Sequence, residues 1–256
     1  GGFDYSWSPD GKWFTLEFIG NRHDPYSDIG MVSAQGGKIF NLTNSGYTSG
    51  SPRWVLDGNA IFFITERYGM RAHASWGSLN DVMLVFMNQD AYDKFRLSKE
   101  DYELQKELEK EQKNTTEAKK NDKKKGDNKE KSEEKKEEKV KDIVVELNNI
   151  EDRIVRLTPN SSDLGSAIIT KDGETLYYLS AFEGGYDLWK MNLRKKDTKL
   201  LHKMDAGWAN MEMDKDGKNL FLLGSNTMQK MGTDSESLKP ISYQAHVKMD
   251  LAAERD

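Results

Sequence analysis

Apolar and polar residues alternate in short runs along this chain, and turn signals separate the runs. The first example is WSPDGKWFTLEF at residues 7–18, in which Pro-Asp-Gly lies between two aromatic-rich stretches. Asp-Gly suits the positive-φ positions of a tight hairpin turn, and aromatic and β-branched residues favour strands. The pattern predicts a β-hairpin, with Trp7 and its neighbours in the first strand.

The same turn occurs at four places in the sequence. Its residues are Asp10 and Gly11, Asp57 and Gly58, Asp172 and Gly173, and Asp216 and Gly217. The aspartates are 47, 115 and 44 residues apart, so the middle interval equals one repeat plus an insertion of roughly 70 residues. We interpret all eight residues as structural turn positions rather than as a metal site, because the repeat places the aspartates far apart.

Each turn is followed by further strand-like runs. Third strands are predicted at 28–34, 81–87 and 186–193, fourth strands at 37–43, 152–158 and 198–204, and the outer strands of the last copy at 226–232 and 241–249. Four strands in roughly 45 residues are typical of a β-propeller blade. We therefore predict an all-β fold with four propeller blades that belong to a larger ring of six or seven.

A charged insertion interrupts the second blade. Residues 101–141 contain 14 Lys and 13 Asp or Glu. Glu-to-Lys pairs favour a solvated helix in its first part, and its middle has almost nothing to bury. We predict blades one and two (first part) over 1–98, a helical then disordered insertion over 99–141, and the remaining blades over 142–256. We interpret the insertion as a loop that the blade tolerates at little cost, in preference to an arm that binds a partner.

Composition excludes several classes of function. Outside 101–141 the chain has 24 basic and 30 acidic residues, which argues against a nucleic-acid-binding or membrane-binding surface. There is no cysteine, and no run of about 18 apolar residues that would span a membrane. The chain begins with Gly1 rather than Met, so we expect a processed or excised piece of a longer protein.

The sequence offers no catalytic constellation. None of the four histidines, His23, His73, His202 and His246, lies in a metal-ligand pattern, and no Gly-x-Ser-x-Gly elbow is present. We therefore predict no catalytic residue, no metal site and no cofactor in this chain. Any enzymatic activity would belong to the parent protein.

One stretch concentrates candidate binding residues. Residues 65–81 join the second and third strands of the second blade and contain Arg67, Tyr68, Arg71, His73 and Trp76. Arginine and aromatic side chains at a propeller opening are suited to hold the carboxylate and side chains of a peptide. The alternative, which we favour, is packing between blades with Trp76 buried.

Six other aromatic residues are expected in the core. They are Trp7, Trp54, Phe182, Tyr186, Trp189 and Trp208. Each lies in or beside a predicted strand, where aromatic residues fill the space between blades.

Several segments resemble one protein family. SPDGK at the first turn resembles the propeller repeats of tricorn-type serine peptidases and of the Tol-system periplasmic propeller protein. The segments 51–77, 81–103 and 148–158, which ends in IEDRIVRLT, resemble bacterial tricorn homologues, in which a charged insertion interrupts a blade at this place. SYQAHVKMDLAAERD at the end resembles the family's exit from the propeller toward its peptidase region.

The resemblance implies a function. The chain would be the non-catalytic propeller of a serine endopeptidase, filtering or guiding peptides or unfolded polypeptide toward Ser and His residues in C-terminal peptidase domains of the same protein. It also implies a periplasmic or otherwise exported protein, with the cytoplasm as the alternative, and leaves homo-oligomers open. Two other functions remain: a stand-alone scaffold akin to the Tol-system protein, and a propeller-bearing dipeptidyl peptidase with a nucleophile elbow downstream.

Overall fold

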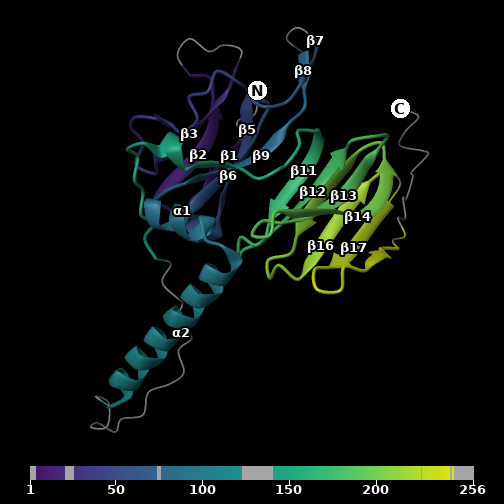
Figure 1. Cartoon of the computed structure of the whole chain (residues 1–256). Helices are drawn as coiled ribbons and strands as arrows, with labels where there is room; N and C mark the ends of the chain where they lie inside the picture. Colours follow the sequence, from purple (N-terminus) through teal and green to yellow (C-terminus); the bar gives the residue numbers. More distant parts are fainter. Residues whose placement is uncertain are drawn as a thin grey trace, which may run out of the picture.

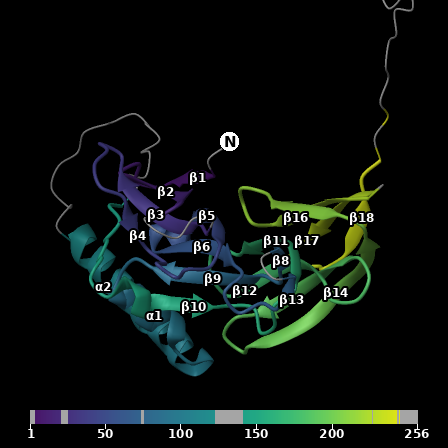
Figure 2. The ribbon, with the colours of Figure 1, turned by 90° about the horizontal axis from the view of Figure 1, so that it is seen from above.

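The described part of the chain forms four blades. The computed structural model describes residues 4–20, 26–73, 76–122, 141–225, 227–242 and 244, and these residues contain four antiparallel sheets of four strands each. The sheets follow one another around an arc (Figure 2), as in a β-propeller. Within these ranges, no helix combines the length and apolar character needed to cross a membrane.

Three blades have their strands in sequence order. Blade 1 consists of β1 (Tyr5–Trp7), β2 (Trp13–Phe18), β3 (Asp28–Ser33) and β4 (Phe40–Asn41). Blade 3 consists of β11 (Asp163–Ile169), β12 (Thr175–Ala181), β13 (Tyr186–Asn192) and β14 (Asp197–Ala206). Blade 4 consists of β15 (Ala209–Met213), β16 (Asn219–Gly224), β17 (Thr227–Gly232) and β18 (Leu238–Pro240).

Blade 2 carries two additions. Its own strands are β5 (Ser49–Val55), β6 (Ala60–Thr65), β9 (Asp81–Phe86) and β10 (Ile154–Arg156), with the short helix η1 (Leu56–Gly58) between β5 and β6. A hairpin of β7 (Arg71–His73) and β8 (Trp76–Ser78) connects β6 to β9. The connection from β9 to β10 contains α1 (Gln89–Arg96), α2 (Lys99–Asp122) and η2 (Ile150–Arg153).

Most predicted strands agree with the structure, but two fourth strands and the last outer strand differ. The fourth strand expected at 37–43 is only Phe40–Asn41, and the one expected at 152–158 begins within η2 and is a strand only at Ile154–Arg156. The outer strand expected at 241–249 is wrong: β18 takes that place and pairs with β17, while 241, 242 and 244 are outside any strand. The remainder of 241–249 lies outside the described residues. The sequence also gave no indication of α1.

Three apolar clusters fill the spaces between the blades. The cluster between blades 1 and 2 includes Ile29, Met31, Leu42, Ile61 and Val85. The cluster between blades 2 and 3 includes Phe62, Leu84, Phe86, Leu176 and Tyr178, and the cluster between blades 3 and 4 includes Tyr177, Leu179, Leu220 and Leu222. Burial of each such side chain contributes about 1.5–3 kcal/mol, so the apolar strand faces hold neighbouring blades together.

The Asp-Gly turns are built in three ways. At the first and third turns the aspartate closes the loop, since Asp10 accepts hydrogen bonds from Ser8 Oγ (2.6 Å) and the Lys12 amide (3.1 Å). Asp172 accepts the equivalent bonds from Thr170 Oγ1 (2.6 Å) and the Glu174 amide (3.0 Å). The glycines of these turns, Gly11 and Gly173, have φ of 68° and 71°.

The second and fourth turns differ. At the second turn, Leu56, Asp57 and Gly58 form η1, and all three have positive φ. At the fourth turn the carboxylate that closes the loop belongs to Asp214, which accepts the Lys218 amide at 2.7 Å. Asp216 and Gly217 occupy the predicted turn, but the closing acceptor lies two residues before Asp216.

The expectation that all six aromatic residues are core is wrong for three of them. Trp7, Trp208 and Phe182 have exposed fractions of 54%, 52% and 45%. β1 is an end strand of its sheet, so Trp7 contacts Phe14 (ring centroids 5.3 Å apart) on one side and solvent on the other. Trp189 is half-buried and stacks with Tyr178 at 6.4 Å, as expected for packing.

Candidate functional site

The segment singled out by the sequence projects from one end of the blades. Residues 65–81 carry the β7–β8 hairpin, which lies at the end opposite to α2 (Figure 1). The backbone pairs His73 with Trp76 and Arg71 with Ser78. The side chains of Arg71, His73 and Trp76 are outside the described residues, so their role in binding stays a prediction.

At the base of this hairpin, Tyr68 lies near two guanidinium groups. The Cζ atom of Arg67 is 5.6 Å from the ring centroid, and that of Arg156 is 5.0 Å away. Tyr68 is 49% exposed. Both distances are in the range of cation–π attraction. We refer to Arg67, Tyr68 and Arg156 as the Tyr68 cluster. Tyr68 and Arg156 are 88 positions apart in the sequence.

A buried carboxylate positions Arg156. Asp81 is fully buried and accepts hydrogen bonds from Arg156 Nε (2.9 Å), Thr158 Oγ1 (2.7 Å) and Ser161 Oγ (2.7 Å). Arg156 Nη2 is 2.8 Å from the same carboxylate. Because Asp81 has these partners, its buried charge is compensated, and it holds the guanidinium in one orientation beside Tyr68.

Blade 1 contains the same arrangement without an arginine. There Asp28 accepts hydrogen bonds from Asn41 Nδ2 (2.9 Å) and Thr43 Oγ1 (2.8 Å). The tripeptides Asn-Leu-Thr at 41–43 and Arg-Leu-Thr at 156–158 therefore have the same structural role. Sequence reasoning missed Asp81 and Arg156, although this match between the ends of two predicted fourth strands carried the signal.

The Tyr68 cluster is chemically suited to an anionic group next to an apolar one. Among the described residues, Nη1 of Arg156 has no hydrogen-bond partner, and the Arg67 side chain is exposed. Guanidinium groups form strong, charge-assisted hydrogen bonds with carboxylates. A half-exposed tyrosine between them adds a flat contact surface for a side chain.

A cavity lies at the other end of the blades. Its volume is about 840 Å³, and it is bounded by α1, α2, the chain around 144–146 and the turns of blades 2 and 3. Its lining includes the carboxylates of Asp57, Asp90, Asp93, Glu109, Glu146 and Asp172. Two of its cations are bound within the protein, because Lys94 pairs with Glu109 at 2.7 Å and Arg194 donates to backbone carbonyls.

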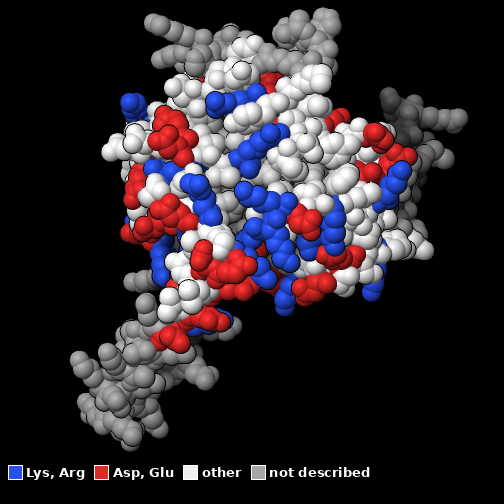
Figure 3. Space-filling model, viewed as in Figure 1, with Lys and Arg blue, Asp and Glu red and all other residues white. Residues whose placement is uncertain are grey.

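Charges of both signs lie on the surface of the described residues. On the face seen in Figure 3, basic side chains lie mainly near the middle, with acidic side chains around them. In the described part of the chain, no three His, Cys, Asp or Glu side chains are grouped so as to hold a metal ion.

Comparisons with known proteins agree with the fold. No family model matches the chain. A segment of 58 residues, 23% of the chain, is 38% identical to an uncharacterized peptidase, YuxL, of Bacillus subtilis. The structure is similar to that of the tricorn protease, with a TM-score of 0.59 and 11% identity over 93% of the chain. It is also similar to TolB from Acinetobacter baumannii, with a TM-score of 0.50 and 14% identity over 93% of the chain.

The chain corresponds to only part of each of these proteins. It spans 8% of the Bacillus peptidase, 22% of the tricorn protease chain and 42% of the TolB chain. At these identities the structural likeness shows a β-propeller fold and not a function.

Proposed function

We propose that this chain is the non-catalytic propeller segment of a tricorn-like serine peptidase, and that it binds peptides and guides them toward an active site outside this chain. The observation that carries the proposal is the Tyr68 cluster, in which two guanidinium groups flank a half-exposed ring. Support also comes from the likeness to the tricorn protease and from the 58-residue match to a peptidase.

In this role the chain makes and breaks no covalent bond. A peptide carboxylate would be held by the guanidinium groups of Arg67 and Arg156, and an adjacent peptide side chain would lie against Tyr68. Hydrogen bonds to charged groups contribute about 1.5–3 kcal/mol each, which favours weak, reversible binding suited to passage of a peptide. The proposed partners are peptides and the peptidase region of the same protein, and the proposed location is exported.

Peptide binding with matched variants tests the proposal. The probe is a ten-residue unstructured peptide with a free C-terminal carboxylate and a fluorescein label at its N-terminus, compared with its C-terminally amidated form. Arg156→Asn is the informative variant, because it introduces the residue that partners Asp28 in blade 1 and so leaves Asp81 with a donor. Arg96→Gln is the control, since Arg96 also stacks on a tyrosine, 5.2 Å from the Tyr92 ring, but lies on α1.

The proposal predicts that the carboxylate peptide binds wild type and Arg96→Gln equally. Arg67→Gln and Arg156→Asn should each weaken its binding about tenfold, the loss of one charge-assisted hydrogen bond. Equal binding of the amidated peptide, or equal binding by all variants, would contradict a carboxylate site at the Tyr68 cluster.

The second candidate is a scaffold for folded protein partners. The likeness to TolB favours it. A scaffold would recognise a folded surface and bind neither form of the short peptide. The same titration therefore separates the two functions.

A further inference from the structure

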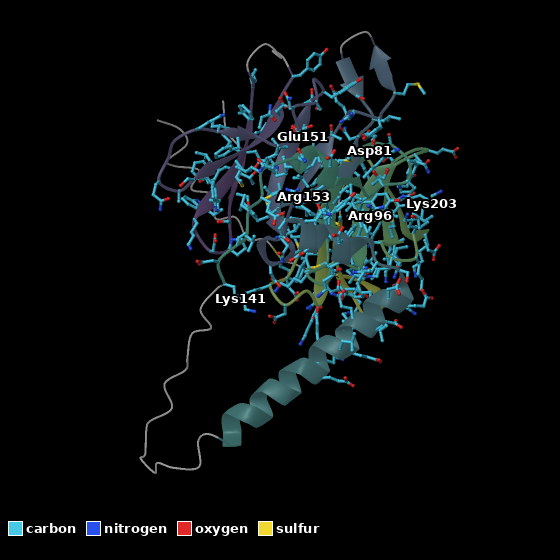
Figure 4. The ribbon with its side chains drawn as sticks, turned by 60° about the vertical axis from the view of Figure 1, so that its left-hand side comes forward. Asp81, Arg96, Lys141, Glu151, Arg153 and Lys203 are labelled. Atoms are coloured by element: carbon cyan, nitrogen blue, oxygen red, sulfur yellow. The ribbon has the colours of Figure 1, made fainter. Side chains whose placement is uncertain are left out.

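The two arms of the blade 2 insertion contact different neighbouring blades. The outgoing arm is formed by α1 and the first turns of α2, and the return arm by residues 141–149. Figure 4 shows Lys141, the first described residue of the return arm, at the lower edge of the body, on the side from which α2 extends. The insertion therefore does not simply leave the blade into solvent.

The outgoing arm packs against the junction of blades 2 and 3. Phe95 of α1 contacts Phe86 (ring centroids 5.0 Å apart), a member of the apolar cluster shared by the two blades. Arg194 of blade 3 donates from Nη1 to the carbonyl oxygens of Phe95 (3.2 Å) and Leu97 (3.3 Å), at the C-terminal end of α1. A cation at a helix C-terminus satisfies its free carbonyls and its dipole.

The first turns of α2 are fixed to the same blade. The guanidinium of Arg194 lies 3.4 Å from the centroid of the Tyr102 ring, and Tyr102 is only 8% exposed. One turn further, Lys106 pairs with Glu174 at 3.0 Å, in the Asp-Gly turn of blade 3. Arg194 thus holds both helices of the arm.

The return arm is fixed to blade 1. The amide of Ile143 donates to Asp10 Oδ2 at 3.0 Å, and Lys12 pairs with Asp142 at 2.6 Å. The side chain of Ile143 occupies the space beside Gly58 that a Cβ atom would need. These contacts involve the Asp-Gly turns of blades 1 and 2.

Blade 2 itself holds the base of the return arm. Arg153 is 4% exposed and donates to the carbonyl oxygens of Phe86 (3.2 Å), Asn148 (3.2 Å) and Glu146. Val145 and Leu147 pack against the apolar cluster between blades 1 and 2. The guanidinium of Arg153 therefore joins the two ends of the insertion, since Phe86 precedes the outgoing arm and Glu146 lies in the return arm.

We propose that the insertion is a strap, which ties blade 2 to blade 3 through its outgoing arm and to blade 1 through its return arm. The charged sequence suggested a loop that costs little to insert or remove. The contacts of Arg194, Ile143 and Arg153 instead make the angles between the three blades depend on the insertion. The strap uses residues 89–111 and 141–149, and its contribution is independent of any peptide at the Tyr68 cluster.

Hydrogen–deuterium exchange of the full 256-residue chain tests the strap with matched pairs of variants. For the outgoing arm, Arg194→Met is compared with Lys195→Met, which removes an exposed charge from the next residue. For the return arm, Ile143→Ala is compared with Val144→Ala, whose side chain is 61% exposed.

The strap predicts effects on both sides of each contact. Arg194→Met should speed exchange about tenfold in α1 and also at the amides of Asn80 and Ser162, which pair with each other between blades 2 and 3 away from the helices. Ile143→Ala removes the side chain that packs beside Gly58, so it should speed exchange in the turn around Gly58 and, by loosening the return arm, in the turn around Asp10. The control variants Lys195→Met and Val144→Ala should leave exchange at all of these amides unchanged.

Two results would overturn the proposal. One is exchange in Arg194→Met and Ile143→Ala equal to that of their controls. The other is an increase confined to the inserted arms, with the blade turns and the Asn80–Ser162 pair unchanged, because the insertion would then be a passive appendage. If Arg194→Met does not fold, Arg194→Lys keeps the charge, loses the planar fork, and is predicted to show a smaller change at the same amides.

Discussion

The buried carboxylate of Asp81 holds the guanidinium of Arg156, with Arg156 Nη2 2.8 Å from Asp81 Oδ1. The pair connects the start of β9 to the end of β10, across the whole length of the insertion. The Asp81–Arg156 pair stabilises blade 2, since the carboxylate also accepts hydrogen bonds from Thr158 and Ser161. The pair also positions the candidate binding site, because it fixes Arg156 on one side of the Tyr68 cluster.

Asp81→Asn is expected to lower the free energy of unfolding by about 2–4 kcal/mol. The amide cannot form the ion pair, and the variant leaves buried donors with a weaker acceptor. Chemical denaturation measures the change. Asp152→Asn, an exposed aspartate of η2, serves as the control and should stay within about 0.5 kcal/mol of wild type. A loss of less than about 1 kcal/mol for Asp81→Asn would show that the buried carboxylate is not a structural centre of blade 2.

The turns offer a comparison between aspartates of the same repeat. Asp10→Ala and Asp214→Ala each remove the acceptor that closes a turn and should cost about 1 kcal/mol. Asp216→Ala should cost less than about 0.5 kcal/mol, because the closing acceptor of its turn is Asp214. Thermal unfolding of the three variants distinguishes them, and equal losses for Asp214→Ala and Asp216→Ala would contradict the assignment.

Alanine substitutions at two glycines distinguish the stability cost of backbone strain from that of side-chain crowding. Gly11 has φ of 68° with nothing near the position of an added Cβ, so Gly11→Ala should cost about 1 kcal/mol from strain alone. Gly58 has φ of 87°, and its added Cβ would collide with Ile143, so Gly58→Ala should cost about 1–3 kcal/mol more. Denaturation midpoints measure both. If the two substitutions cost the same, Ile143 does not pack on blade 2 as described.

Stability should fall in acid because several carboxyl groups have lowered pKa values. Hydrogen bonds from Lys190 and then Lys199 hold the pKa of Glu236 below its ordinary 4.5. Burial raises the pKa of Asp10, but hydrogen bonds from Ser8 and from the Ile143 and Lys12 amides outweigh it and lower the pKa below 3.8. A carboxyl with a lowered folded-state pKa stabilises the protein fully above its unfolded pKa and loses this contribution as pH falls through the folded value.

The loss of stability should therefore begin near pH 4.5 and continue below pH 3.8. Unfolding by urea, measured between pH 7 and pH 3, follows it. Glu236→Gln should flatten the upper part of this dependence, whereas Glu183→Gln, an exposed control, should leave it unchanged. A flat profile for wild type would contradict the assigned ion pairs.

Local sequence was sufficient to predict the blades. Asp-Gly turns, strand-like runs and their regular spacing depend on neighbouring residues, and β2, β6, β12 and β16 follow the four turns as expected. The eight-residue helix α1 was missed because it is too short for a clear helical period. Its stability comes from packing against Phe86 and from the contact with Arg194, about 100 residues away.

The candidate site was predicted only in part for the same reason. Arg67 and Tyr68 are candidates from the sequence because they are adjacent in a loop rich in arginine and aromatic residues. Arg156 and Asp81 were not, since their meeting depends on pairing of β9 with β10 across the insertion. Trp7 was placed in the core because alternation does not reveal which strand ends a sheet.

The most direct test of peptide guidance maps where a peptide binds on the chain. Hydrogen–deuterium exchange is measured for the full chain with and without a saturating unstructured peptide that has a free C-terminal carboxylate. Peptide binding at the Tyr68 cluster predicts protection that includes residues 66–70 and 156–161, and weaker protection of both segments in Arg156→Asn at the same peptide concentration. Protection confined to the cavity between α1, α2 and the turns of blades 2 and 3, or none at all, would contradict it.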